Sequence, residues 1–241
     1  MKLLLISNSF GVNLQTYAKE IAKENDFNLE IYTLYIGGCP LELHDKNIKE
    51  NKKDYELFVD GTSTGKFVSI NDTLEMEEWD YISLQQASHV SGDVSSYYPY
   101  FKNVYTYVLK LCPHAKIMFH KTWPYSGKNK TKFNEVKTWL PSFKFIDDVE
   151  MKKGIDEAVE RISNDFKIDL IIDSAKVVFE GMKIFDDLYD SEGFHLNKLG
   201  CLLIGLNLIK KLISGNVKLV EKIENFDEKT LKKATDFINQ L

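Results

Sequence analysis

Residues 2–11 read KLLLISNSFG, an apolar run that leads into a polar turn. Residues 2–6 form a short, continuous apolar run, which is typical of a parallel strand that is buried on both faces. The run gives way to polar residues, so we expect Ser9 just beyond the carboxyl end of the first strand. Ligands of open α/β sheets bind at these carboxyl ends. The loop therefore predicts a site, although a serine there could also be an ordinary turn or helix-cap residue.

Strand-like and helix-like segments alternate along the rest of the chain. Further core strands are expected at 29–36, 81–84, 116–120 and 169–172. This alternation predicts a three-layer α/β/α sandwich, flavodoxin-like, with helices on both faces of a five-stranded parallel sheet. Two short β-runs within 55–70 surround Asp60-Gly61, and we expect them to form a small β-hairpin inserted at the rim. Without an evident linker or repeat, residues 1–241 are expected to form a single domain.

Composition argues against several classes of function. Of the 241 residues, 44% are hydrophobic and 28% are charged, as in a globular chain. The net charge of −5 disfavours nucleic-acid binding, which needs a concentrated basic face. No apolar run reaches the roughly 18 residues of a membrane span. Three unpatterned cysteines and a short apolar N-terminus predict a cytoplasmic protein with reduced thiols. We expect no metal, because no tight ligand cluster is evident, and no other cofactor.

Ser9 is a candidate nucleophile, and the C-terminal part of the chain contains a histidine that could act as its general base. Residues 190–197 read DSEGFHLN, which places His195 directly before the last core helix. A short turn could bring Glu192 to Nδ1 of His195, where the carboxylate would fix the tautomer and leave Nε2 to accept the serine proton. Asp190 is a second candidate for this acid. A dyad of Ser9 and His195, supported by a backbone carbonyl, is a third arrangement.

Two further strand-end loops offer groups that could stabilise an oxyanion. Gly38 follows the second strand and lets a backbone N–H approach a ligand without a Cβ in the way, unless it merely ends the strand. Gln86 follows the third core strand, where its amide could complete an oxyanion hole with the N–H groups of Ser9 and Gly38. The alternative is that Gln86 bonds neighbouring loop backbone.

These segments, in this order, resemble the SGNH hydrolase superfamily, also called GDSL-type lipases and acylhydrolases. The run Ser7-Asn8-Ser9-Phe10 is most similar to an uncharacterised bacterial branch that has Gly-Asn-Ser-Phe in place of Gly-Asp-Ser-Leu. Gly38 fits the second block, and Gln86 stands where the superfamily usually has Asn. Glu192 to His195 fits the final Asp-x-x-His block. The resemblance spans roughly residues 2–210, with Ser7, Gln86 and Glu192 as departures from the usual Gly, Asn and Asp.

The resemblance implies a serine hydrolase acting on short acyl esters, including acetylated sugars. His195 would deprotonate Ser9, Ser9 would attack the ester carbonyl, and water would then cleave the acyl-enzyme. The expected partner is thus a small-molecule ester, with no nucleic acid and no membrane. Two other interpretations stay open. One is a flavodoxin-like module that binds a phosphate or nucleotide, and the other is a non-catalytic sugar-binding relative.

Several other residues are candidates for contact with a substrate. Asn8 lies in the first block, and His89 and His120 fall on strand-end loops, although a structural hydrogen bond explains His120 equally well. Trp123 belongs to the run HKTWPY at 120–125, which resembles a segment of the same bacterial branch. Further aromatic residues that could form a wall for a sugar ring or acyl chain, or pack in the core instead, are Tyr97, Tyr98 and Tyr125.

Overall fold

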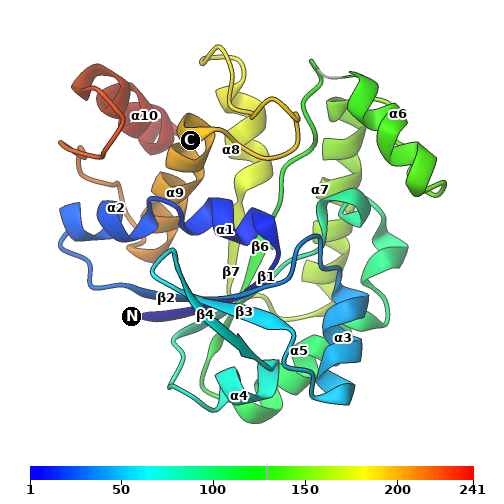
Figure 1. The fold of residues 1–241 in the computed structure, drawn as a ribbon. Helices are drawn as coiled ribbons and strands as arrows, with labels where there is room; N and C mark the ends of the chain where they lie inside the picture. Colours follow the sequence, from blue (N-terminus) through cyan, green and yellow to red (C-terminus); the bar gives the residue numbers. More distant parts are fainter. Residues whose placement is uncertain (129) are drawn as a thin grey trace.

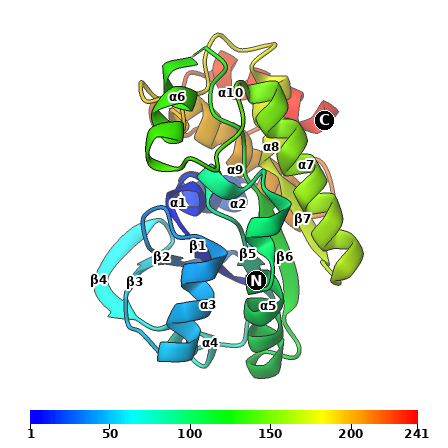
Figure 2. The ribbon, with the colours of Figure 1, turned by 90° about the vertical axis from the view of Figure 1, so that its right-hand side faces the viewer.

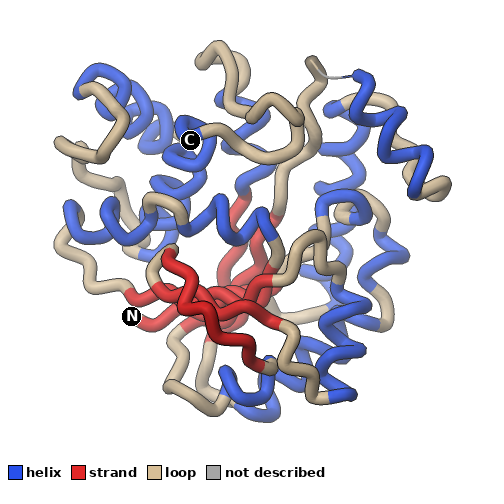
Figure 3. Tube along the Cα trace, viewed as in Figure 1, coloured by secondary structure: helices blue, strands red, loops and turns tan. Residues whose placement is uncertain are grey.

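A twisted sheet of seven strands forms the centre of the molecule (Figure 1, Figure 3). The computed structural model describes residues 1–128 and 130–241. The strands are β1 (Lys2–Ser7), β2 (Glu30–Tyr35), β3 (Tyr55–Val59), β4 (Thr62–Val68), β5 (Tyr81–Leu84), β6 (Lys116–Lys121) and β7 (Leu170–Asp173). Their spatial order is β4-β3-β2-β1-β5-β6-β7. Strands β2, β1, β5, β6 and β7 pair in parallel, whereas β3 and β4 are antiparallel to their neighbours.

The sheet is larger than the five strands expected from the sequence. Strand β3 pairs with β2, with Leu57 opposite Leu34, so the segment expected at the rim extends the sheet instead. Tyr55 and Leu57 are buried in the core, which explains why this strand lies against the sheet. The alternation of strand-like and helix-like segments predicts that strands exist, but not which strands pair with each other. The predicted count of five strands in the sheet was therefore wrong.

Helices cover both faces of the sheet, which confirms the predicted three-layer α/β architecture (Figure 2). One layer contains α1 (Ser9–Gln15), α2 (Ala18–Glu24), α8 (Ser174–Gly181), α9 (Lys198–Leu212) and α10 (Glu228–Gln240). The other contains α3 (Leu41–Glu50), α4 (Ile70–Leu74), α5 (Tyr100–Leu111) and α7 (Asp148–Asp165), and its core also receives side chains of α6 (Lys130–Trp139). None of the helices in the described part of the chain is long and apolar enough to cross a membrane.

Strand β1 shows how the apolar run at the N-terminus generates these layers. Leu3 and Leu5 face the core beneath α1, α2 and α9, whereas Leu4 and Ile6 face the core on the other side. All four side chains are at most 1% exposed. A strand that is buried on both faces in this way lies in the middle of the sheet, and its carboxyl end places Ser9 at the centre of the sheet edge.

Candidate active site

Ser9 is the first residue of α1, directly after β1. Asn8 caps this helix with extended backbone angles, and its Oδ1 accepts the Phe10 N–H at 3.0 Å. This cap turns the chain sharply from strand to helix, because the cap residue satisfies an N–H that has no partner within the helix. The Ser9 side chain is therefore held at the carboxyl edge of the sheet.

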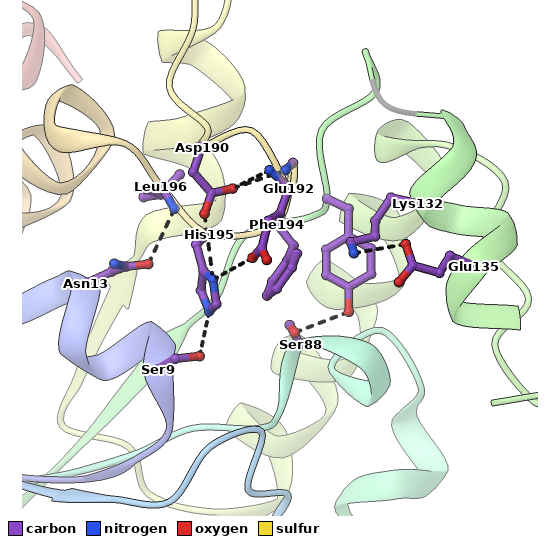
Figure 4. A network of polar contacts seen from close by, with 12 residues as sticks. Ser9, Asn13, Ser88, Lys132, Glu135, Asp190, Glu192, Phe194, His195 and Leu196 are labelled. Atoms are coloured by element: carbon purple, nitrogen blue, oxygen red, sulfur yellow. Dashed lines mark hydrogen bonds and ion pairs between the residues drawn. The ribbon is translucent and has the colours of Figure 1, made fainter. Parts of the chain in front are cut away.

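The loop that precedes α9 places His195 against Ser9 (Figure 4). His195 Nε2 lies 2.8 Å from Ser9 Oγ, although 186 residues separate them in the chain. The Trp123 indole N–H donates to the Phe194 carbonyl at 2.8 Å, and Leu196 N–H donates to Asn13 Oδ1 at 3.4 Å. These bonds anchor the backbone on both sides of His195, so the imidazole is presented by a supported loop.

Two carboxylates face the other nitrogen of the His195 ring. Glu192 Oε2 lies 3.5 Å from Nδ1, and Asp190 Oδ2 lies 3.8 Å from it. Asp190 is the more constrained of the two, because its Oδ1 accepts the N–H groups of Glu192 and Gly193 at 3.0 and 3.1 Å. The Glu192 side chain is 56% exposed, against 33% for Asp190. The structure thus brings both predicted acids to His195.

Trp123 supports the site from within the core, which contradicts the expected contact with substrate. Its ring is fully buried and stacks on Phe10 at 4.1 Å between centroids. Tyr97 and Tyr125 are also buried, and their hydroxyls bond Ser91 O and Ser88 Oγ. These rings pack inside the molecule, so they do not form the expected wall.

Gln86 is not free to bind an oxyanion, and this part of the sequence prediction was wrong. Its Nε2 donates to the carbonyl and the hydroxyl of Ser96, at 2.9 and 3.0 Å. Its Oε1 accepts the N–H groups of Leu41 and Ala87, both at 2.9 Å. The amide therefore joins neighbouring loops to the start of α3, as the alternative interpretation held. Gly38, unlike Gln86, remains a candidate for the oxyanion hole. Its φ of +61° suits glycine, and a Cβ there would meet nothing within 4 Å, so its surroundings are open.

The other candidates for substrate contact are also engaged elsewhere. Asn8 is 2% exposed and uses its side chain to accept from Phe10 and Gln85 and to donate to Cys39 O. His120 is 1% exposed, and burial lowers its pKa to about 3. His89 packs edge-on against Trp139. A polar residue at a strand end can point inward as well as outward, and the sequence does not distinguish the two.

A pocket of about 420 Å³ lies beside Ser9 and His195. Its lining residues are Ser9, Val12, Asn13, Tyr35, Phe58, Asp190, His195 and Leu196. The rings of Tyr35 and Phe58 meet edge to face at 5.7 Å between centroids. Neither ring was predicted from the sequence to lie at the site. The place of Tyr35 at the end of the second strand is a usable signal, but that of Phe58 depends on the pairing of β3 with β2.

Among the described residues, His195 and the two carboxylates beside its ring form a group that could hold a cation. One ligand atom each from Asp190, Glu192 and His195 lie within 4.8 Å of one another. A cation on His195 Nδ1 would leave the ring proton on Nε2, and that nitrogen could then no longer accept a proton from Ser9. Cation binding and a base role for His195 therefore exclude each other.

Gly11 lets α1 pack closely over the end of β1, and we expect Gly11→Ala to displace Ser9. A Cβ at this position would lie 2.2 Å from Ser7 Oγ and 2.6 Å from Ser7 Cβ. We expect both the melting temperature and any turnover that depends on Ser9 to fall. Adding Ser7→Gly should restore most of the loss, because it removes the atoms that clash. Equal loss in the single and double variants, measured by thermal melts and turnover, would contradict this account.

The fold is shared with solved structures of esterases and lipases. Solved structures with this fold include a carbohydrate esterase of family 3 from Talaromyces cellulolyticus, with a TM-score of 0.58 at 12% identity, covering 93% of this chain and 100% of that one. A member of the lipolytic protein G-D-S-L family from Veillonella parvula DSM 2008 gives 0.51 at 13% identity, covering 87% and 97%. The chain thus has the SGNH hydrolase fold, as its sequence motifs indicated.

The chain belongs to the family described as Domain of unknown function (DUF4886), which it matches over residues 2–229. A DUF4886 family protein from Bacteroides uniformis ATCC 8492 has a TM-score of 0.87 at 26% identity, covering 100% of this chain and 93% of that one. No curated protein matches the chain.

Proposed function

We propose that this protein is a serine esterase in which Ser9 is the nucleophile and His195 the general base. The observation that carries the proposal is the 2.8 Å contact between Ser9 Oγ and His195 Nε2, with carboxylates at Nδ1 of the same ring. A nucleophile, a base within hydrogen-bond reach and a group that orients the base are the three parts that activate a serine. Fold neighbours that are esterases and lipases support the same class.

The geometry supports acyl transfer in two steps. The Ser9 hydroxyl gives its proton to His195 Nε2 as Oγ attacks the ester carbonyl carbon. The imidazolium that forms is stabilised by the carboxylates at Nδ1, and it then protonates the leaving alcohol as the C–O bond breaks. Water attacks the acyl-enzyme with His195 again as base, which releases the acid and restores Ser9.

Backbone N–H groups are the donors for the oxyanion in this proposal. Ser9 N–H belongs to the first turn of α1, where N–H groups have no partner within the helix. Gly38 adds a second N–H from the loop after β2, whose open surroundings leave room for a ligand. Gln86 takes no part, because both of its amide atoms are engaged.

The pocket beside Ser9 favours a small ester, and an acetylated sugar is the substrate class that we propose. Tyr35 and Phe58 offer apolar ring surface, whereas Asn13 and Asp190 offer polar atoms on the same wall. Such a mixture of aromatic faces and a few polar groups is typical of small-molecule sites. The carbohydrate esterase among the fold neighbours agrees with this class.

A fluorophosphonate probe tests the proposal directly, because it reacts with activated serines. We expect one adduct per chain, located on Ser9 by mass spectrometry of the digested protein, and turnover of a short-chain nitrophenyl ester. His195→Gln is the matched control, since it removes the base and leaves Ser9 in place, and we expect it not to label. An intact wild-type protein that neither labels nor hydrolyses the ester would be a non-catalytic relative, and the proposal would be wrong.

A further inference from the structure

We propose that a buried chain of hydrogen bonds, from Ser174 through His120 and Gln85 to Asn8, fixes the relative positions of the loops that carry Ser9 and Gly38, as the proposed reaction requires. The inference rests on the proposed function, because it concerns how the nucleophile and the oxyanion donors are kept in place. None of the four residues would touch a substrate. We assign them as positioning residues, and we name the set the buried relay.

The buried relay is continuous, and its four side chains are buried. Ser174 Oγ lies 3.0 Å from His120 Nε2, and His120 Nδ1 lies 3.0 Å from Gln85 Oε1. Gln85 Nε2 then donates to Asn8 Oδ1 at 2.7 Å. The four residues are at most 2% exposed. Bonds between buried polar groups are costly to lose, because a freed donor or acceptor finds no water in exchange.

The direction of each bond follows from the Asn8 end. Asn8 Oδ1 accepts the Phe10 N–H as well as Gln85 Nε2, which fixes the orientation of the Gln85 amide. Gln85 Oε1 can then only accept, so the proton of a neutral His120 must be on Nδ1. His120 Nε2 is left as an acceptor for the Ser174 hydroxyl. Burial lowers the pKa of His120 to about 3, which keeps the ring neutral near pH 7.

The buried relay connects the carboxyl ends of four of the five parallel strands, and a bond from Asn8 to Cys39 adds the fifth. Asn8 follows β1, Gln85 follows β5, His120 lies near the end of β6, and Ser174 directly follows β7. At the other end, Asn8 Nδ2 donates at 3.2 Å to the carbonyl of Cys39, in the loop after β2.

The bond from Asn8 Nδ2 to the Cys39 carbonyl connects the buried relay to the proposed oxyanion donors. Cys39 is the residue after Gly38, so the Asn8 side chain ties the proposed oxyanion loop to the loop that carries Ser9. The same side chain caps the helix that begins at Ser9. Loss of Gln85 would remove one of the three hydrogen bonds that hold the Asn8 side chain, and we expect this to loosen both loops together. Displacement of catalytic groups by about 1 Å can lower a rate by about 100-fold.

The first test compares Gln85→Met with Thr33→Val. The first variant removes the central amide but keeps its volume. The control removes a buried hydrogen bond of similar length, from Thr33 Oγ1 to Gln15 Oε1 at 2.8 Å, which also lies beneath α1 but has no link to Asn8. We expect both variants to lower the melting temperature. Gln85→Met alone should lower kcat for a nitrophenyl ester by about 10- to 100-fold with little change in KM, because it loosens groups that act in the transition state.

Equal kcat in both variants and wild type would show that Gln85 is merely structural and would overturn the positioning role. A wild-type protein without labelling or turnover would overturn the proposed function, and the positioning role with it. The hydrogen-bonded chain itself is decided separately, by ¹⁵N NMR of histidine-labelled protein near pH 7. We expect His120 to be neutral with the proton on Nδ1, and to lose this tautomer preference in Gln85→Met. A proton on Nε2 in the wild type would overturn the buried relay.

Discussion

Ser9→Ala should reduce the hydrolysis of a short-chain nitrophenyl ester by at least about 1,000-fold, because the proposed acyl-enzyme forms on Ser9 Oγ. The substitution removes one atom, Oγ, whose contact is with His195 Nε2. What would remain is direct attack by water on the ester, assisted by His195 and the backbone N–H groups but without an acyl-enzyme. Steady-state turnover and loss of labelling by the fluorophosphonate probe measure the effect.

Fold and chemistry can be separated in this experiment. The core residues around α1 are untouched, so the melting temperature of Ser9→Ala should stay close to that of the wild type. Ser191→Ala is a suitable control, because Ser191 is an exposed serine in the same loop as His195. We expect that control to label and to turn over normally. Unchanged turnover in Ser9→Ala would remove Ser9 from the mechanism.

The sequence predicts this site well where local chemistry determines the geometry. The apolar run of β1 ends in a polar turn, and this pattern alone places Ser9 at the sheet edge. Likewise the spacing from Glu192 to His195 predicts a short turn that brings a carboxylate to Nδ1 of the imidazole, and in the structure both Glu192 and Asp190 lie near that nitrogen. The position of Ser9 and the turn before His195 each depend on a few consecutive residues, so both can be predicted without tertiary structure.

Predictions that depend on the direction of a side chain were less accurate, as the prediction for Gln86 shows. Gln85 and Gln86 are adjacent at the end of β5, and the sequence gives no reason to separate them. In the structure Gln86 turns toward α3, whereas Gln85 turns toward Asn8 and His120. Gln86 was assigned to the oxyanion hole because it stands where the superfamily usually has Asn, and Gln85 was not assigned. The orientation of each amide depends on tertiary partners, such as Leu41 for Gln86 and His120 for Gln85, that the sequence does not identify.

The remaining question at the site is which carboxylate serves His195, and we expect the two to substitute for each other in part. Glu192→Gln should lower kcat by only a few-fold, because Glu192 is more than half exposed and ordering its long side chain costs entropy. Asp190→Asn should lower kcat by roughly 10- to 100-fold. Its Oδ1 would stay in the turn and its amide N–H would face Nδ1, which favours the wrong tautomer of His195.

The double variant Asp190→Asn/Glu192→Gln should lose more than the product of the single losses, by about 1,000-fold in total. Either carboxylate alone can still accept a hydrogen bond from the Nδ1–H group, whereas with both gone the imidazolium forms without a counter-charge. A double variant that loses no more than Asp190→Asn would assign the role to Asp190 alone. One that stays as active as the wild type would favour the dyad, in which the loop backbone rather than a carboxylate orients His195. The double-mutant cycle in kcat thus distinguishes the three arrangements that the sequence left open.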